Sequence, residues 1–168
     1  LAKLKHFQAL VFFNHVSTLE HVAAELKHQH ISSVKLAGHQ VQTERATAMR
    51  LFRKGDAKLL LTTEMAARGL DIPDLPAVVN FDLPQDATAY THRTGRTGRM
   101  GNEGMIVNMG DDHDLRDLRK LVPSVTFKPL FLLHGKLTDQ REVLTDDEPE
   151  SSEAKATEAV ITKPSVNS

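Results

Sequence analysis

Residues 58–73 read Lys-Leu-Leu-Leu-Thr-Thr-Glu-Met-Ala-Ala-Arg-Gly-Leu-Asp-Ile-Pro, an apolar run followed directly by polar and charged side chains. The run Lys58–Thr62 predicts a buried strand, because it is short and almost continuously apolar. The segment Thr62–Pro73 then lies just past the carboxyl end of that strand, where open α/β sheets bind their ligands. Its hydroxyl, carboxylate and guanidinium groups suit such a site, although a plain strand-to-helix turn with an Arg–Asp ion pair fits the same residues.

The rest of the body alternates short apolar runs with amphipathic segments. Strands are expected over residues 9–13, 33–37, 77–81, 104–109 and 125–133. Helices are expected behind a capping box formed by Ser17 and Glu20, and over residues 43–54, 85–94 and 111–121. In the second helix Ala46, Met49 and Phe52 are expected to share a buried face. Strands that alternate with helices and are apolar throughout predict an α/β fold, with a mostly parallel sheet covered on both faces.

Charge divides the 168 residues into two parts. Residues 1–141 carry 19 basic and 15 acidic residues, a net charge of +4, whereas residues 142–168 carry 2 basic and 7 acidic residues, a net charge of −5. From Thr145 onward apolar periodicity stops, so we expect a lobe over residues 1–141 and an acidic tail without regular structure over residues 142–168. The tail is either an interaction segment or a linker to a further region.

Composition excludes several classes of protein. The chain has no cysteine, which rules out disulfides and thiolate metal sites. No apolar run is long enough to span a bilayer, and no signal peptide is recognisable, so a cytoplasmic location without membrane contact is expected. The first residue is Leu1 rather than methionine, which indicates a fragment.

The densest motif is Tyr90–Gly101, in which three arginines recur at every third position with glycines between them. Glycines are unfavourable inside a helix, so the helix is expected to end near Gly95. Planar, permanently charged guanidinium groups suit bidentate phosphate binding. A generic basic, glycine-rich loop is the alternative interpretation of the spacing.

Together these segments resemble the C-terminal lobe of the DEAD-box RNA helicases. Met65–Pro73 resembles the fifth helicase motif of that family, and His92–Arg99 resembles the sixth. Val11–Asn14 resembles the fourth motif, Gln42–Arg45 the Q-x-x-R element, and Val79–Pro84 the connection between motifs five and six. Histidine rather than glutamine at position 92 favours the DEAD-box type over the DEAH and RecQ types. The resemblance implies a three-layer α/β/α RecA-like fold of the P-loop NTPase type.

The resemblance also implies roles for individual residues. Arg96 and Arg99 are expected to be catalytic and to reach the γ-phosphate of ATP, with Arg99 as the arginine finger; Asp71 and Gly69 would also contact ATP. Arg68, His92 and Arg93 are expected to meet the acidic motif of an N-terminal RecA-like lobe. The residues expected on the RNA side are Asn14, Gly38, Gln42, Arg45, Thr63 and Glu64. Glutamate at position 64 stands where the family usually has aspartate, and its side chain is one methylene longer.

Two motifs that ATP hydrolysis needs are absent. The sequence contains neither a G-x-x-x-x-G-K-[ST] phosphate loop nor an Asp-Glu-Ala-Asp motif for Mg²⁺. The resemblance places both on the N-terminal lobe, so no metal site is expected here and this chain alone should hydrolyse ATP at background rate. The expected whole function is ATP-dependent unwinding or remodelling of RNA duplexes. The alternatives are a non-catalytic RNA- or protein-binding module and a DNA helicase lobe.

Overall fold

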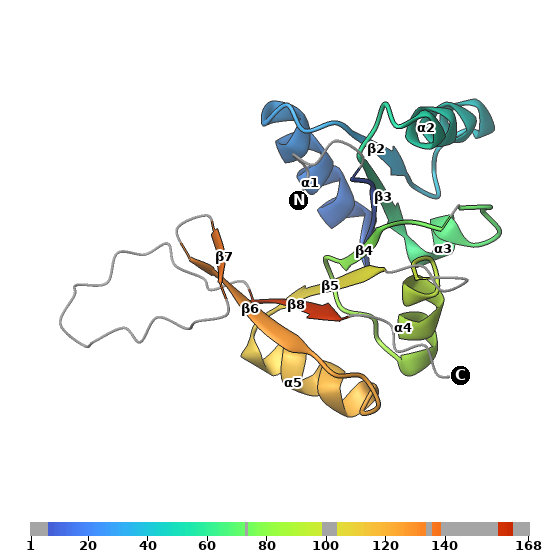
Figure 1. Ribbon diagram of the computed structural model, residues 1–168. Coiled ribbons are helices and arrows are strands. Elements are labelled where there is room, and N and C mark those ends of the chain that lie inside the picture. Colours follow the sequence, from blue (N-terminus) through green and yellow to red (C-terminus); the bar gives the residue numbers. More distant parts are fainter. Residues whose placement is uncertain (1–6, 73, 99–103, 134–135, 139–157, 163–168) are drawn as a thin grey trace.

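The computed structural model describes residues 7–72, 74–98, 104–133, 136–138 and 158–162 (Figure 1). The strands are β1 Ala9–Phe13, β2 Ser33–Leu36, β3 Leu59–Thr63, β4 Ala77–Asn80, β5 Met105–Gly110, β6 Lys128–Leu133, β7 Lys136–Thr138 and β8 Glu158–Thr162. The helices are α1 Val16–His28, α2 Gln42–Lys54, α3 Glu64–Ala67, α4 Ala87–Thr94 and α5 Asp112–Leu121.

One sheet runs through the molecule in the order β2-β3-β1-β4-β5-β8-β6-β7. The first five strands are parallel, with β1 in the centre between β3 and β4. The pairs β5–β8, β8–β6 and β6–β7 are antiparallel. The expected α/β fold with a mostly parallel sheet is confirmed, and parallel strands place all their carboxyl ends at one edge.

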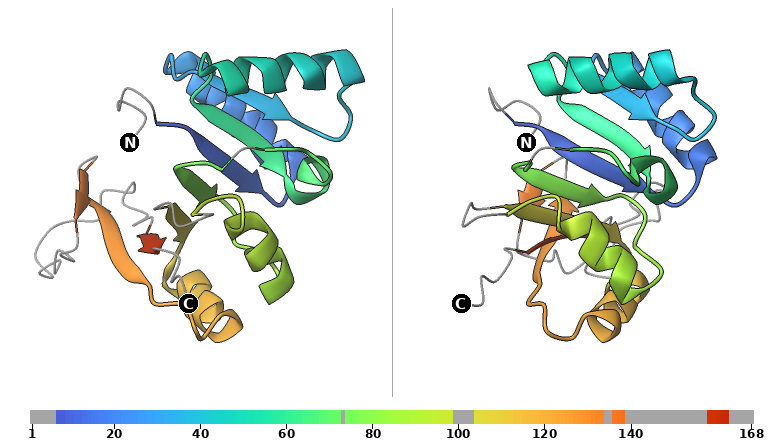
Figure 2. Two further views of the ribbon diagram at one scale, coloured as in Figure 1. Left: turned by 45° about the vertical axis from the view of Figure 1, so that its right-hand side comes forward. Right: turned by 90° about the vertical axis from the view of Figure 1, so that its right-hand side faces the viewer.

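The sheet buries a different helix on each face because successive side chains of a strand point to opposite sides. In β1, Leu10 and Phe12 pack into the cluster that includes Met49 of α2. Val11 pairs instead with the cluster around Leu19 of α1. Figure 2 shows α1 and α2 on opposite sides of the parallel strands. All five residues of β1 are buried, which is why its sequence is apolar without alternation.

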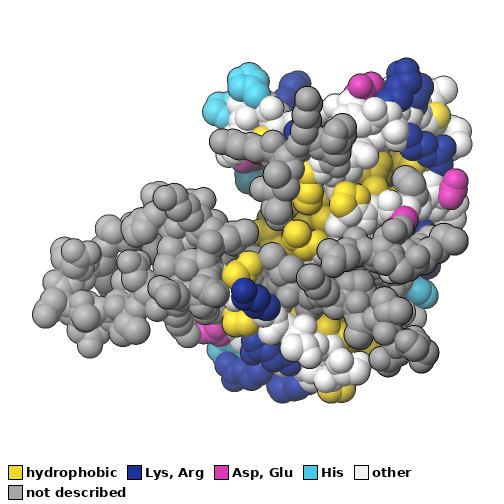
Figure 3. Space-filling view, viewed as in Figure 1, with side chains coloured by type: hydrophobic (Ala, Val, Ile, Leu, Met, Phe, Trp, Pro, Cys, Tyr) yellow, Lys and Arg dark blue, Asp and Glu magenta, His cyan; other side chains and the backbone are white. Residues whose placement is uncertain are grey.

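Helices α4 and α5 begin at the aspartates that the sequence indicates. The Asp86 side chain accepts a hydrogen bond of 2.7 Å from the backbone N–H of Ala89. Asp111 forms a capping box with Asp114, so this run of acids begins a helix, as expected. The basic residues in the last turn of α5 suit the helix dipole, and Figure 3 shows basic side chains gathered over this helix.

Two local expectations are wrong. Helix α1 begins at Val16 after His15, without a side-chain cap, so Ser17 lies inside the first turn and forms no capping box. In α2, Ala48 is buried instead of Ala46, beside Met49 and Phe52. A spacing of three residues drifts around a helix that has 3.6 residues per turn, which turns Ala46 away from the core.

The acidic tail contains a strand that we did not expect. Residues 158–162 form β8, between β5 and β6. Val160, Ile161 and Thr162 are β-branched and favour extended backbone, but the run is short and follows an acidic stretch. The rest of the tail lies outside the described residues. Within the described part of the chain, no helix is both long and apolar enough to cross a membrane.

Candidate functional site

The candidate site lies at the carboxyl edge of the parallel strands. Asn14 follows β1, Gly38 follows β2, Glu64 follows β3 and Asp82 follows β4. Helix α4 brings His92 and Arg93 to the same edge, where Figure 1 shows it close to α3. Segments that are far apart in the sequence therefore meet here.

Arg93 is the hub of this edge, with its side chain only 3% exposed. Its guanidinium donates hydrogen bonds to the backbone oxygen of Asp82 at 2.9 Å and to Oδ1 of Asn14 at 2.8 Å. Its Nε lies 3.7 Å from Oε2 of Glu64, and its Cζ lies 5.2 Å from the centroid of the Phe12 ring. One side chain thus ties together the ends of β1, β3 and β4.

Burial lowers the pKa of Arg93, and the neighbouring carboxylates of Glu64, Asp82 and Asp86 oppose that shift. Arginine nonetheless stays protonated in proteins, so the buried group is a permanent cation. A buried cation is tolerated only when it is paired and hydrogen-bonded. The resemblance assigns Arg93 to the contact between two lobes. In this structure its guanidinium donates its hydrogen bonds to residues of the same lobe.

The sequence reading missed two asparagines that support Arg93. Asn80 and Asn108 face each other across β4 and β5, and the Nδ2 of Asn80 donates to the Oδ1 of Asn108 at 2.7 Å. Both are fully buried, and the Oδ1 of Asn80 lies 3.5 Å from NH1 of Arg93. The available signal was an amide at the end of an otherwise apolar strand, since a buried polar group needs a partner.

The short helix α3 holds Glu64 between two arginines. Thr63 begins the helix, with its hydroxyl accepting a hydrogen bond of 3.4 Å from the N–H of Ala66. Glu64 then lies 3.7 Å from Arg93 and 3.9 Å from Arg68. The side chain of Arg68 is 74% exposed, so this arginine remains free to turn toward a ligand or another domain.

A cavity of about 310 Å³ joins the two arginine-bearing motifs. Gly69 has a φ of +71°, a left-handed conformation that glycine adopts without strain. Arg96 extends from the end of α4, and its one hydrogen bond to a described residue is a long one of 3.5 Å, from NH1 to the backbone oxygen of Leu70. The predicted residues that line this cavity are Glu64, Arg68, Gly69, His92, Arg93 and Arg96.

A second hollow of about 420 Å³ lies on the other side of the same side chains. It is bounded by the segment after β1, by α3 and by α4. Glu64, Arg68 and Arg93 line both hollows and thus form the wall between them. Asn14 and Thr63, two of the predicted RNA-side residues, line only this second hollow.

The remaining predicted residues fall into an open and a bound group. Gly38 and Gln42 are exposed, and nothing lies within 4 Å of a Cβ placed at Gly38. Arg45 is bound internally, with NH2 donating to the backbone oxygen of Ala66 at 3.0 Å. It holds the loop before α2 against α3.

Asp71 lies outside both hollows, and its carboxylate is 99% exposed. Arg53 donates to its backbone oxygen at 2.6 Å and lies 3.5 Å from its Oδ2. The carboxylate therefore remains accessible to a ligand. Arg99 lies outside the described residues; the chain leading to it is anchored by Thr97, whose hydroxyl donates to the backbone oxygen of Leu75.

Among residues 7–72, 74–98, 104–133, 136–138 and 158–162, no group of three or more His, Asp or Glu side chains is placed to hold a metal ion. The site's chemistry is instead that of guanidinium groups and open backbone, which suits anionic ligands.

Comparisons with known proteins agree with this geometry. The model of the helicase conserved C-terminal domain matches residues 1–101. The pre-mRNA-splicing ATP-dependent RNA helicase PRP28 of Pyricularia oryzae is 44% identical over 62% of this chain and 16% of its own length. The ATP-dependent RNA helicase eIF4A of Candida albicans is 36% identical over 68% of this chain and 29% of its own length. The chain thus spans less than a third of either relative.

Solved structures share the fold as well. Dbp5 of S. cerevisiae, solved bound to RNA and ADP BeF3, superposes with a TM-score of 0.64 at 32% identity, over 71% of this chain and 32% of Dbp5. The fold, the motifs and the relatives lead to one assignment: the chain belongs to the helicase C-terminal domain family, and is a RecA-like lobe of the DEAD-box type.

Proposed function

We propose that this chain is the C-terminal lobe of an ATP-dependent RNA helicase, and that it supplies arginines for ATP hydrolysis and backbone contacts for RNA. The observation that carries the proposal is the 310 Å³ cavity, in which Arg68, Gly69 and Arg96 converge from two separate motifs. ATP-dependent RNA helicases among the relatives, and a similar lobe in Dbp5 with RNA and ADP BeF3, support it.

On the nucleotide side, Arg96 is the group best placed to receive a phosphate. Its guanidinium lines the cavity and makes one long hydrogen bond to the part of the lobe that the structure describes. Such a cation stabilises the charge that develops on a transferred phosphoryl group. The family resemblance assigns the same action to Arg99, as the arginine finger. Asp71 would accept hydrogen bonds from the ribose hydroxyls through its exposed carboxylate.

The fit to ATP is partial. Gly69 leaves open space and Arg96 offers donors, which suits the phosphate end of the nucleotide. The described residues supply neither a phosphate loop nor a carboxylate cluster, so this lobe is assigned no Mg²⁺ step. An N-terminal RecA-like lobe would contribute both, and ATP would lie between the two lobes.

On the RNA side, Gly38 and Gln42 are the residues open to direct contact with the sugar–phosphate backbone. Asn14 and Arg45 instead hold the neighbouring loops in place through internal hydrogen bonds. Contacts to phosphate and sugar fix the position of RNA without reading its sequence. Thr63 and Glu64, at the end of β3, line the second hollow together with Asn14.

Exposed Arg68 and His92 would meet acidic groups of the N-terminal lobe when the two lobes close on ATP and RNA. Arg93 would act indirectly, by holding the surrounding loops in place, because its guanidinium is buried among Asn14, Glu64 and Asp82. A cytoplasmic location remains a prediction from the sequence.

The experiment compares ATP turnover with RNA, with single-stranded DNA of the same sequence and without nucleic acid. It uses two proteins, this chain alone and the chain joined to an N-terminal helicase lobe. The proposal predicts background turnover for the chain alone and RNA-stimulated turnover for the joined protein. Equal stimulation by DNA would point to a DNA helicase lobe, and full turnover by the chain alone would contradict the proposal.

A further inference from the structure

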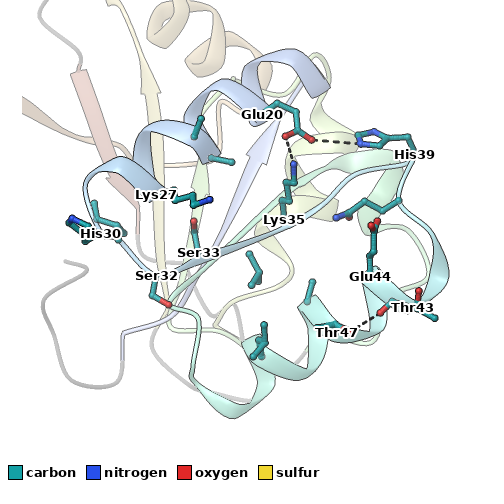
Figure 4. Close-up of a pocket in the computed structure, with 17 residues that line it drawn as sticks. Glu20, Lys27, His30, Ser32, Ser33, Lys35, His39, Thr43, Glu44 and Thr47 are labelled. Carbon is teal, nitrogen blue, oxygen red and sulfur yellow. Dashed lines mark hydrogen bonds and ion pairs between the residues drawn. The ribbon is translucent and has the colours of Figure 1, made fainter.

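A large cavity that shares no lining residue with the two hollows of the candidate site runs along strand β2. Its volume is about 1130 Å³, and it is lined by side chains of α1, β2 and α2 (Figure 4). Among the described strands, β2 is the last at its end of the sheet and pairs with β3 alone. The cavity is therefore a groove with the open edge of β2 at its bottom and one helix along each side.

The backbone of β2 offers unused hydrogen-bonding groups to this groove. The oxygen of Ser32 accepts from the N–H of Leu59 at 3.3 Å, and Ser33 is in register with Leu59. Even-numbered residues of β2 thus face β3, and the N–H and C=O groups of Ser33 and Lys35 face the groove. Within the described part of the chain, these four groups have no hydrogen-bond partner. Such an edge is a template for another strand.

The walls suit the side chains of an added strand. On the α1 side the groove presents the small residues Ala23 and Ala24. On the α2 side it presents Ala48 and Leu51. Because successive side chains of a strand point to opposite faces, an added segment would place alternate residues against each helix.

The ends of the groove carry opposite charges. Lys27 and His30 lie where β2 begins, and Glu44 lies beyond its end, as Figure 4 shows. Neither Lys27 nor Glu44 forms an ion pair with any described residue, whereas Lys35 is paired with Glu20. The two carboxylates of Glu20 and Glu44 balance the two ammonium groups of Lys27 and Lys35. The groove therefore has no excess of these cations to attract the phosphates of RNA.

We propose that this groove binds one extended segment of a partner polypeptide, which adds to β2 as an antiparallel strand. Antiparallel pairing is the more stable arrangement, and it places a basic residue near Glu44 at the segment's N-terminal end. An acidic residue then lies near Lys27 at its C-terminal end. The flanking helices favour a single extended segment as the occupant, because α1 and α2 lie on both sides of the edge and such a segment brings no helices of its own.

A designed peptide tests the proposal on the 168-residue chain itself, independently of any helicase activity. The probe is the capped, fluorescein-labelled heptapeptide Lys-Val-Thr-Val-Thr-Val-Glu, followed by fluorescence anisotropy and by amide shifts in NMR. The expected result is saturable binding that shifts the amides of Ser33 and Lys35. Absence of binding, or shifts confined to the candidate site at the carboxyl edge, would overturn the proposal.

Backbone methylation of the probe gives the sharpest control. One version is N-methylated at its three valines and the other at its two threonines. Only one set of amides can face β2, so one version should lose binding and the other should retain it. Equal binding of both versions, or loss of binding in both, would show that the peptide is not held as a strand.

Two variants of the protein separate backbone from side chain. Lys35→Pro removes an outward N–H at a position where an edge strand tolerates proline, and should weaken binding about tenfold. Lys35→Thr removes the ion pair with Glu20 but keeps that N–H, and should bind nearly as the original chain does. Equal weakening by both variants would contradict strand addition.

If Lys35→Pro does not fold, the two methylated probes alone test strand addition. Dimerisation of the chain through β2, seen by sedimentation and abolished by Lys35→Pro, would overturn the choice of occupant.

Discussion

The guanidinium of Arg93 donates a 2.8 Å hydrogen bond to the side-chain oxygen of Asn14, a residue 79 positions earlier in the chain. The side-chain nitrogen Nδ2 of Asn14 in turn donates to the backbone oxygen of Leu83 at 2.9 Å. Two residues from separate helicase motifs are thereby fixed against the end of β4. The loops that carry the candidate site are held by this network rather than by apolar packing alone.

Arg93→Ala should destabilise the lobe by roughly 3–5 kcal/mol, because it leaves Asn14 Oδ1 and the backbone oxygen of Asp82 without their donor and leaves Glu64 with only the exposed Arg68. Arg93→Lys should recover only part of the loss, since an ammonium group cannot reach acceptors in three directions. Urea unfolding of the chain, followed by circular dichroism, measures both variants. A loss below about 1 kcal/mol for Arg93→Ala would show that the network is not a structural hub.

Asn80 and Asn108 should behave as a coupled pair. Asn80→Ala leaves the amide of Asn108 buried without its partner, and should cost about 1–3 kcal/mol. The double variant Asn80→Leu with Asn108→Leu removes both polar groups, and should cost less than the two single leucine variants added together. A double-mutant cycle in urea measures this difference, and strict additivity would argue against the pairing.

Gly69 and Gly38 form a matched pair for substitution by alanine. Neither position has an atom within 4 Å of an added Cβ, but Gly69 has a φ of +71°. Gly69→Ala should therefore cost roughly 1–2 kcal/mol of unfolding free energy from backbone strain alone. Gly38→Ala should change the unfolding free energy by less than about 0.5 kcal/mol. Equal losses at the two positions would contradict a conformational role for Gly69.

Arg68 should matter for activity and not for folding. Its side chain is 74% exposed and lies 3.9 Å from Glu64, an arrangement worth under about 1 kcal/mol. Arg68→Ala should leave the unfolding free energy nearly unchanged and lower RNA-stimulated ATP turnover in a protein that joins this lobe to an N-terminal lobe. Lys120→Ala is the control, since it removes a similarly exposed pair with Asp117 far from the site. Equal turnover in both variants would remove Arg68 from the interface.

The strands were predictable because β1, β3, β4 and β5 are short apolar runs, and their parallel direction followed from the helices between them. The helix starts at Asp86 and Asp111 were also predictable from local sequence. These features depend on neighbours within a few residues.

The burial of Arg93 was not predictable, because its partners come from three distant segments and a charged residue is normally exposed. The asparagines of β4 and β5 carried a signal, an amide inside an apolar strand, but their pairing needed the strand register. The groove along β2 depends on which strand lies at the edge of the sheet, which sequence order alone does not reveal.

Above all, we propose that this lobe supplies Arg96 to ATP hydrolysis. The most direct measurement is RNA-stimulated ATP turnover by a protein that joins this chain to an N-terminal helicase lobe, with Arg96→Ala beside the exposed control Arg50→Ala. The account predicts a fall of about 10³-fold or more for Arg96→Ala, no change for Arg50→Ala, and equal unfolding free energies for both. Turnover by Arg96→Ala equal to that of the unsubstituted protein would contradict it.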